Sequence, residues 1–191
     1  MESRSPAPTP PTDVMPFEAP RSFGGARPGS TKTSDKKPLV ARALSQVGVS
    51  EEGGENRGPK IRRWLKELDL PAGVAWCGAF LAAQLDAAGA ACPAVRSAWA
   101  LDYDTEQSRP VEQYVRFGEA PPVGSLAVYR RGEGGHVGVV VESTPKWIET
   151  VSGNTSDPDG GPADGVHRKR RSLSPASGFR PFAFTPVTYS K

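Results

Sequence analysis

The apolar positions of this chain follow two different periods. Before Pro121 they recur at helical spacing, and after Pro122 they alternate or form short β-branched runs between Gly and Pro breaks. Helices first and strands afterwards are typical of an α+β domain with a mostly antiparallel sheet. The pattern therefore predicts N-terminal helices packed on such a sheet.

Three helices are predicted in the first half of the chain. The first begins at Pro38 and ends at Gly48, and the second opens at Pro59. The third carries Cys77 at its start and runs to about residue 88, and a short fourth helix is expected over 97–103. The apolar faces of the first two helices are formed by Val40, Ala43, Leu44, Val47, Ile61, Trp64, Leu65 and Leu68.

The apolar pattern of the second half of the chain predicts strands. Three segments combine short length with β-branched residues and flanking Gly or Pro, namely residues 125–130, 135–142 and 146–151. Residues 166–173 and 179–184 are two further candidates. Antiparallel pairing of these neighbours would form the predicted sheet.

Residues 1–37 differ from the rest in composition. They are rich in Pro, Ser, Thr, Gly and charge and nearly lack periodic apolar positions. Such a segment cannot bury enough surface to offset its ordering entropy, so we expect a disordered tail. Residues 38–191 are then expected to form one folded domain.

The charge balance restricts the partners. A net charge of +3 over 191 residues favours an anionic surface but is too small to indicate nucleic acid. No apolar run reaches the length of a membrane span, so we expect no membrane insertion. The expected oligomeric state is a monomer. No apolar stretch follows the first charges, so no ordinary signal peptide is expected, which implies cytoplasmic accumulation until release or another export route.

Three residues suggest the chemistry of a thiol hydrolase. Cys77 stands where a helix begins, His136 lies in a strand-like segment, and Asn154 follows the next strand. A helix N-terminus and a nearby imidazolium lower the pKa of a thiol, so Cys77 could act as nucleophile and His136 as general base. Asn154 would then orient the imidazole. A disulfide between Cys77 and Cys92 would block this thiol, and we expect both to be free.

Each of these residues alone also fits an ordinary structural role. A Cys in an Ala-rich helix is commonly core filler, a His beside Gly residues is commonly a turn residue, and Asn after Gly commonly forms a turn. Their order and local contexts, taken together with the layout of helices before strands, favour the catalytic interpretation.

The motifs around these residues resemble those of a CHAP domain. They are Trp76-Cys77-Gly78-Ala79-Phe80, Gly135-His136-Val137-Gly138-Val139-Val140 and Val151-Ser152-Gly153-Asn154-Thr155, preceded by Gly53-Gly54-Glu55-Asn56-Arg57-Gly58-Pro59. CHAP domains are papain-like cysteine, histidine-dependent amidohydrolases or peptidases related to NlpC-type wall peptidases. The resemblance covers about residues 38–184 and implies cleavage of peptidoglycan amide bonds at the cell wall, as endopeptidase or N-acetylmuramoyl-L-alanine amidase.

One position departs from the family pattern. Many relatives carry an acidic residue two positions before this Asn, and here that place holds Ser152. On a regular strand Asn154 shares a face with Ser152 whereas Glu149 faces the other side, so we favour Asn154 as the partner of His136, with Glu149 as the alternative. Some relatives also bind calcium before the nucleophile. Only Asp69 is present there, so we expect no calcium at that spot. A thiol mechanism requires no metal or organic cofactor, so we expect neither.

Two other functions remain open from the sequence. The chain could be a thiol protease or deamidase toxin delivered into another cell, or a non-catalytic wall-binding or virion module that keeps the fold. The basic run His167–Arg171 could bind an anionic wall polymer, but a solvated edge strand is the favoured interpretation. The loop from Asp157 to Asp164 is expected to be an exposed turn rather than a cation site.

Overall fold

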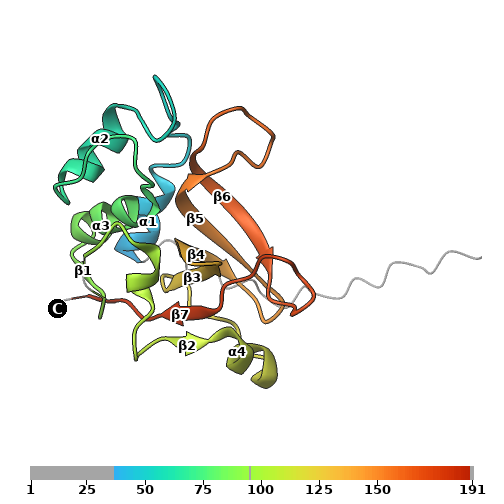
Figure 1. Cartoon of the computed structure of the whole chain (residues 1–191). Coiled ribbons are helices and arrows are strands. Elements are labelled where there is room, and N and C mark those ends of the chain that lie inside the picture. Colours follow the sequence, from blue (N-terminus) through green and yellow to red (C-terminus); the bar gives the residue numbers. More distant parts are fainter. Residues whose placement is uncertain (1–36, 95, 190–191) are drawn as a thin grey trace, which may run out of the picture. The chain divides into compact units, whose positions relative to one another are not determined.

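The computed structural model describes residues 37–94 and 96–189 of the chain. The predicted tail, apart from Lys37, lies outside the described residues. The described part is α+β, as the sequence predicted, with helices beside an antiparallel six-stranded sheet (Figure 1). In this part no helix is both long and apolar enough to span a bilayer.

The three predicted helices are present. They are α1 (Pro38–Leu44), α2 (Pro59–Lys66) and α3 (Cys77–Ala87). Pro stands at the first position of both α1 and α2, where its missing N–H costs no intrahelical hydrogen bond. The regular part of α1 ends before the predicted Gly48, because residues 45–48 continue as a turn. Val47 is consequently 44 % exposed, and its assignment to the buried face was wrong.

Two other helical segments differ from the prediction. The expected helix over 97–103 is a single 3-10 turn, η2 (Ala100–Tyr103). A further helix, α4 (Val111–Phe117), was not predicted. Val111, Tyr114 and Val115 have helical spacing, so a signal was present, but it extends over only two turns. Only Val111 and Tyr114 are buried, whereas Val115 and Phe117 are exposed.

The five predicted strands are present with changed ends, and in the described part of the chain three further strands of two residues each were not predicted. Their bounds are β1 (Ala90–Ala91), β2 (Arg109–Pro110), β3 (Leu126–Arg131), β4 (Gly134–Ser143), β5 (Trp147–Thr155), β6 (Gly165–Ser172), β7 (Ala183–Thr185) and β8 (Thr188–Tyr189). The main sheet has the order β2-β7-β3-β4-β5-β6, and β1 pairs with β8 separately. The central meander β3–β6 is antiparallel throughout, and its edge strand is the basic β6.

Side chains on the two faces of the sheet enter different cores. On one face, Val137 and Val139 of β4 pack with α1, α2 and α3. On the other, Tyr129 of β3 and Val140 of β4 pack with α4 and with Phe184 of β7. Figure 1 shows α1 and α3 beside β4 and β5, and α4 near β2. The sheet is therefore covered on both faces, which fixes its register strongly.

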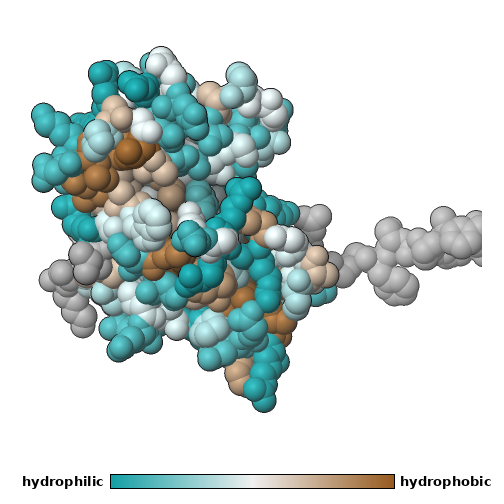
Figure 2. Space-filling view, in the orientation of Figure 1, coloured by the Kyte–Doolittle hydropathy of each residue, from teal (hydrophilic) through white to brown (hydrophobic). Residues whose placement is uncertain are grey.

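The tryptophans divide between core and surface. Trp64 and Trp76 are buried with ring centroids 5.7 Å apart, and Trp76 Nε1 donates a 3.0 Å hydrogen bond to Glu51 Oε1. Tryptophan side chains are buried on average, which predicts a core position for Trp99, but this residue is 57 % exposed. Most of the face in Figure 2 is hydrophilic, and its apolar side chains gather mainly over the region of α2 and α3.

Candidate active site

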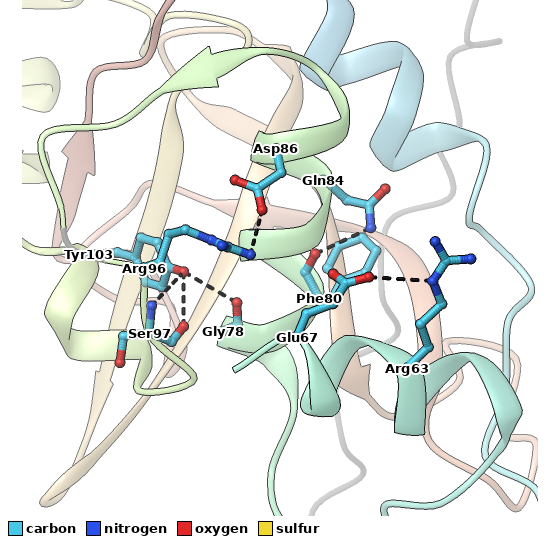
Figure 3. A network of polar contacts seen from close by, with 9 residues as sticks. All are labelled: Arg63, Glu67, Gly78, Phe80, Gln84, Asp86, Arg96, Ser97 and Tyr103. Carbon is cyan, nitrogen blue, oxygen red and sulfur yellow. Dashed lines mark hydrogen bonds and ion pairs between the residues drawn. The ribbon is translucent and has the colours of Figure 1, made fainter. Parts of the chain in front are cut away.

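Close packing fixes the start of α3, where Cys77 lies. A Cβ on Gly78 would overlap the carbonyl group of Ala98 and would lie 2.7 Å from Ser97 O, so this segment can approach the helix only because Gly78 has no side chain. Figure 3 shows the Tyr103 hydroxyl between Ser97 and Gly78, where it lies 2.9 Å from Ser97 O and 3.3 Å from Gly78 O. These contacts hold the Cys77 backbone in a rigid frame.

The sulfur of Cys77 lies against the strand that carries His136. The backbone groups of Gly78 and Val137 lie close enough to the Cys77 thiol to lower its pKa, and Val137 directly follows His136 in β4. Cys77 is a free thiol, as expected, and is 6 % exposed. Burial raises its pKa, and these backbone groups offset only part of that effect. The expected net lowering at the helix N-terminus is therefore wrong for this structure, because desolvation of the thiolate outweighs it.

His136 lies near the start of β4, opposite Tyr129 of β3. The two rings have centroids 5.9 Å apart, and His136 Nε2 is buried without a hydrogen-bond partner among the described residues. The pKa of His136 is lowered to about 4. Burial is the largest cause, and the positive charges of Arg171 and Lys169 add to it. The imidazole is consequently neutral at pH 7, as a general base must be.

Asn154 occupies an irregular position in β5. The ladder between β5 and β6 shifts register between Ser152 and Thr155, and the φ of Asn154 is 52°. Asn tolerates this left-handed conformation better than most residues. The face assignment by strand alternation therefore does not apply here, because a register shift re-aims the side chain.

Asn56 holds the side chain of Asn154 in place. Asn154 Nδ2 donates a 2.8 Å hydrogen bond to Asn56 Oδ1, across 98 positions of the sequence. Asn56 also has a positive φ of 54°, and its carbonyl accepts from Gly73 N, close to the start of α3. The sequence indicated this stretch only as part of a family motif and suggested no role for Asn56. The signal that could have indicated Asn56 was its place in that motif, directly before Arg57-Gly58-Pro59.

One cleft brings the three predicted residues together. A cavity of about 770 Å³ is lined by Cys77, His136 and Asn154. Glu149, the alternative partner for His136, is not among the residues that line it. Its carboxylate accepts a 2.6 Å hydrogen bond from Arg168. In the β4–β5 ladder its backbone lies opposite Glu142, near the far end of β4.

Basic side chains line the same cleft. Arg130 and Arg131 come from the end of β3, and Lys169 and Arg171 come from β6, whereas Asp164 is the one acidic residue among the described lining residues. The favoured interpretation of the basic run was a solvated edge strand. β6 is indeed an edge strand, but alternate residues of it line the cleft, so the structure adds a second role for this strand.

The loop before β6 forms a turn, as expected. Asp159 N donates a 2.9 Å hydrogen bond to Asp157 Oδ1, which is the pattern of an Asx turn. Across residues 37–94 and 96–189 no group of three or more His, Cys, Asp or Glu side chains is arranged to hold a metal ion.

A thiol at a helix N-terminus beside a strand that carries an imidazole is the arrangement of a thiol hydrolase. The family model of the CHAP domain matches residues 70–154, from the loop before Cys77 to Asn154. This match confirms the resemblance to a CHAP domain found in the sequence, and CHAP domains are cysteine/histidine-dependent amidohydrolases or peptidases. It supports a peptidoglycan-related amidase or peptidase function in general. No curated protein and no solved structure shows a significant match.

The lowered pKa of His136 predicts a loss of stability in acid. The unfolded chain gains a proton below the ordinary pKa of 6.5, whereas the folded chain does so only near 4. Stability from this group is thus present above about pH 6.5 and falls as the pH drops toward 4, by about 2 kcal/mol at about pH 5. Urea unfolding of the wild type and of His136→Gln, each at about pH 6.5 and about pH 5, measures how much of the pH dependence of the free energy of unfolding comes from His136. Equal pH slopes in the two proteins would contradict it.

Proposed function

We propose that the cleft is the active site of a peptidoglycan hydrolase that cleaves amide bonds by a thiol mechanism. The observation that carries this proposal is the convergence of Cys77, His136 and Asn154 on one cleft within the matched CHAP region. Cys77 is the nucleophile, His136 the general base and Asn154 the residue that orients the imidazole. The bond is in the stem or bridge peptide, or between the sugar and the stem peptide.

The first half of the reaction forms an acyl-enzyme. His136 takes the proton of Cys77, the sulfur attacks the carbonyl carbon of the amide, and the C–N bond breaks. The imidazolium returns its proton to the leaving amine. The backbone N–H of Cys77, at the first position of α3, is placed to stabilise the negative oxygen of the tetrahedral intermediate.

The second half releases the acid. His136 removes a proton from water, the resulting hydroxide attacks the thioester carbonyl, and the thiolate leaves and is reprotonated. The raised pKa of Cys77 and the lowered pKa of His136 favour the neutral pair at rest. Proton transfer from sulfur to imidazole is therefore a step of the reaction rather than a feature of the resting site.

Selective alkylation tests the proposal. In a Cys92→Ala variant, Cys77 is the one remaining cysteine of the sequence. We expect this variant to release fragments with new amine and carboxyl ends from purified peptidoglycan, as detected by mass spectrometry. Iodoacetamide at alkaline pH, where the thiolate forms, should abolish that release, and a substrate fragment in excess should slow the modification. Full release after complete alkylation of Cys77 would refute the thiol mechanism.

A further inference from the structure

The β6 strand presents two kinds of cation on its two faces. Lys169 and Arg171 line the cleft, whereas Arg168 and Arg170 do not. Arg168 is neutralised by Glu149 at 2.6 Å and Glu142 at 3.3 Å. The guanidinium of Arg170 lies over the ring of Trp147, 3.9 Å from its centroid. The cations that face away from the cleft thus have structural partners.

The cleft-facing cations lack carboxylate partners of the kind that neutralise Arg168. Within residues 37–94 and 96–189, neither Lys169 nor Arg171 makes an ion pair, and Lys169 Nζ donates only to the neutral Ser156 Oγ at 2.9 Å. The Nε of Arg171 is buried with no hydrogen-bond partner in the same described part. A buried donor without an acceptor is costly, and an anion bound to the part of the guanidinium that lines the cleft would offset this cost electrostatically.

Aromatic rings hold the Arg171 guanidinium in a defined orientation. It lies 4.3 Å from the centroid of the Phe179 ring and 5.4 Å from that of Tyr129. These two rings are themselves stacked, with centroids 4.9 Å apart and planes inclined by 2°. A guanidinium fixed in this way loses little entropy on binding, and its fork matches the two oxygens of a carboxylate.

We propose that Lys169 and Arg171 form a subsite that binds a carboxylate of the substrate's peptide next to the scissile amide. This inference rests on the proposed function and names the substrate group that the site selects. Peptidoglycan stem peptides carry free carboxylates close to their amide bonds, and amidation removes that charge. The subsite therefore distinguishes free from amidated stem peptides.

The subsite also acts on the chemistry of the cleft. The charges of Lys169 and Arg171 contribute to the low pKa of His136, and so oppose formation of the imidazolium. A bound carboxylate offsets these charges and makes transfer of the Cys77 proton to His136 easier. Hydrolysis is consequently favoured when the anionic substrate is in place, which affects kcat as well as KM.

The test compares a soluble stem tetrapeptide, L-Ala-γ-D-Glu-L-Lys-D-Ala, with its carboxyl groups free or amidated. Binding is measured by calorimetry on the non-hydrolysing Cys77→Ala protein, and hydrolysis of peptidoglycan with free or amidated stems is measured on the active protein. In Arg171→Gln, the ratio of affinities for the free and amidated peptides should fall roughly 10- to 100-fold. Lys169→Met should lower the same ratio, which guards against a folding defect in the first variant.

Arg170→Gln is the matched control, because it removes the same charge from the opposite face of the same strand and should keep the ratio within about twofold. Equal affinity of the Cys77→Ala protein for the two peptides would overturn the subsite, even if the active protein hydrolyses peptidoglycan. Charge-dependent binding without any hydrolysis would instead refute the proposed function and leave the subsite standing. Tighter, Arg171-dependent binding of poly(glycerol phosphate) than of the free peptide would overturn the carboxylate assignment in favour of a phosphate polymer.

Discussion

Replacing Cys77 by Ala is expected to reduce amide hydrolysis by at least about 10,000-fold, because no other group in the cleft replaces the attacking sulfur. The fold should survive the change. Cys77 behaves as a small, buried side chain at the start of α3, and Ala removes one atom and is a good helix former. Release of soluble fragments from purified peptidoglycan, followed over time, measures the loss.

Cys92→Ala provides the matched control for this prediction. Cys92 is a half-buried free thiol outside the cleft, and its sulfur accepts a 3.4 Å contact from Ala94 N. That variant should retain the wild-type rate within about twofold. Thermal unfolding of both variants shows whether either change disturbs the fold. A Cys77→Ala protein that is folded and as active as the wild type would exclude Cys77 as the nucleophile.

Gly78→Ala is expected to cause a large loss of stability for a change of one methyl group. The new Cβ would overlap the Ala98 carbonyl and lie 2.7 Å from Ser97 O, and these are backbone atoms that cannot rotate away. Helix propensity alone would favour Ala by up to about 1 kcal/mol. Overpacking costs about 1–3 kcal/mol or more, so we expect a net decrease in the free energy of unfolding.

Gly134→Ala is the control for the steric argument. Its Cβ would meet only Arg131 O at 3.7 Å, an ordinary van der Waals contact, so its stability should change by no more than about 0.5 kcal/mol. Urea denaturation of the two variants at neutral pH compares them directly. Unchanged or increased stability of Gly78→Ala would show that the segment around Ala98 moves away at little cost.

Movement of that segment would also disturb the site. The Tyr103 hydroxyl contacts the carbonyl oxygens of both Ser97 and Gly78 (Figure 3). A shift of residues 97–98 therefore changes the surroundings of the first turn of α3. We therefore expect the Gly78→Ala protein to lose activity at temperatures where it remains folded. This loss follows from the displaced frame of Cys77 and not from a change in the reacting groups.

Local pattern was sufficient for much of the fold. Pro38 and Pro59 marked two helix starts, and apolar spacing placed Ile61, Trp64 and Leu65 in the core, because these signals act over one or two turns. The β-branched runs likewise located β3, β4 and β5. Pattern did not find α4, whose seven residues bury only two side chains. It also assigned Trp99 to the core, although its exposure depends on the path of a chain segment without periodicity.

The sequence by itself determined the elements that carry Cys77 and His136, because helix starts and strand alternation are local properties. It could not determine the pKa of either group, since burial and the charges of Arg171 and Lys169 come from distant parts of the chain. The register shift beside Asn154 and its bond to Asn56 likewise exist only after β5, β6 and the loop before α2 have packed together. Tertiary structure alone also decided that Lys169 and Arg171, rather than Arg168 and Arg170, line the cleft. A strand's period fixes which residues share a face, and packing fixes where that face points.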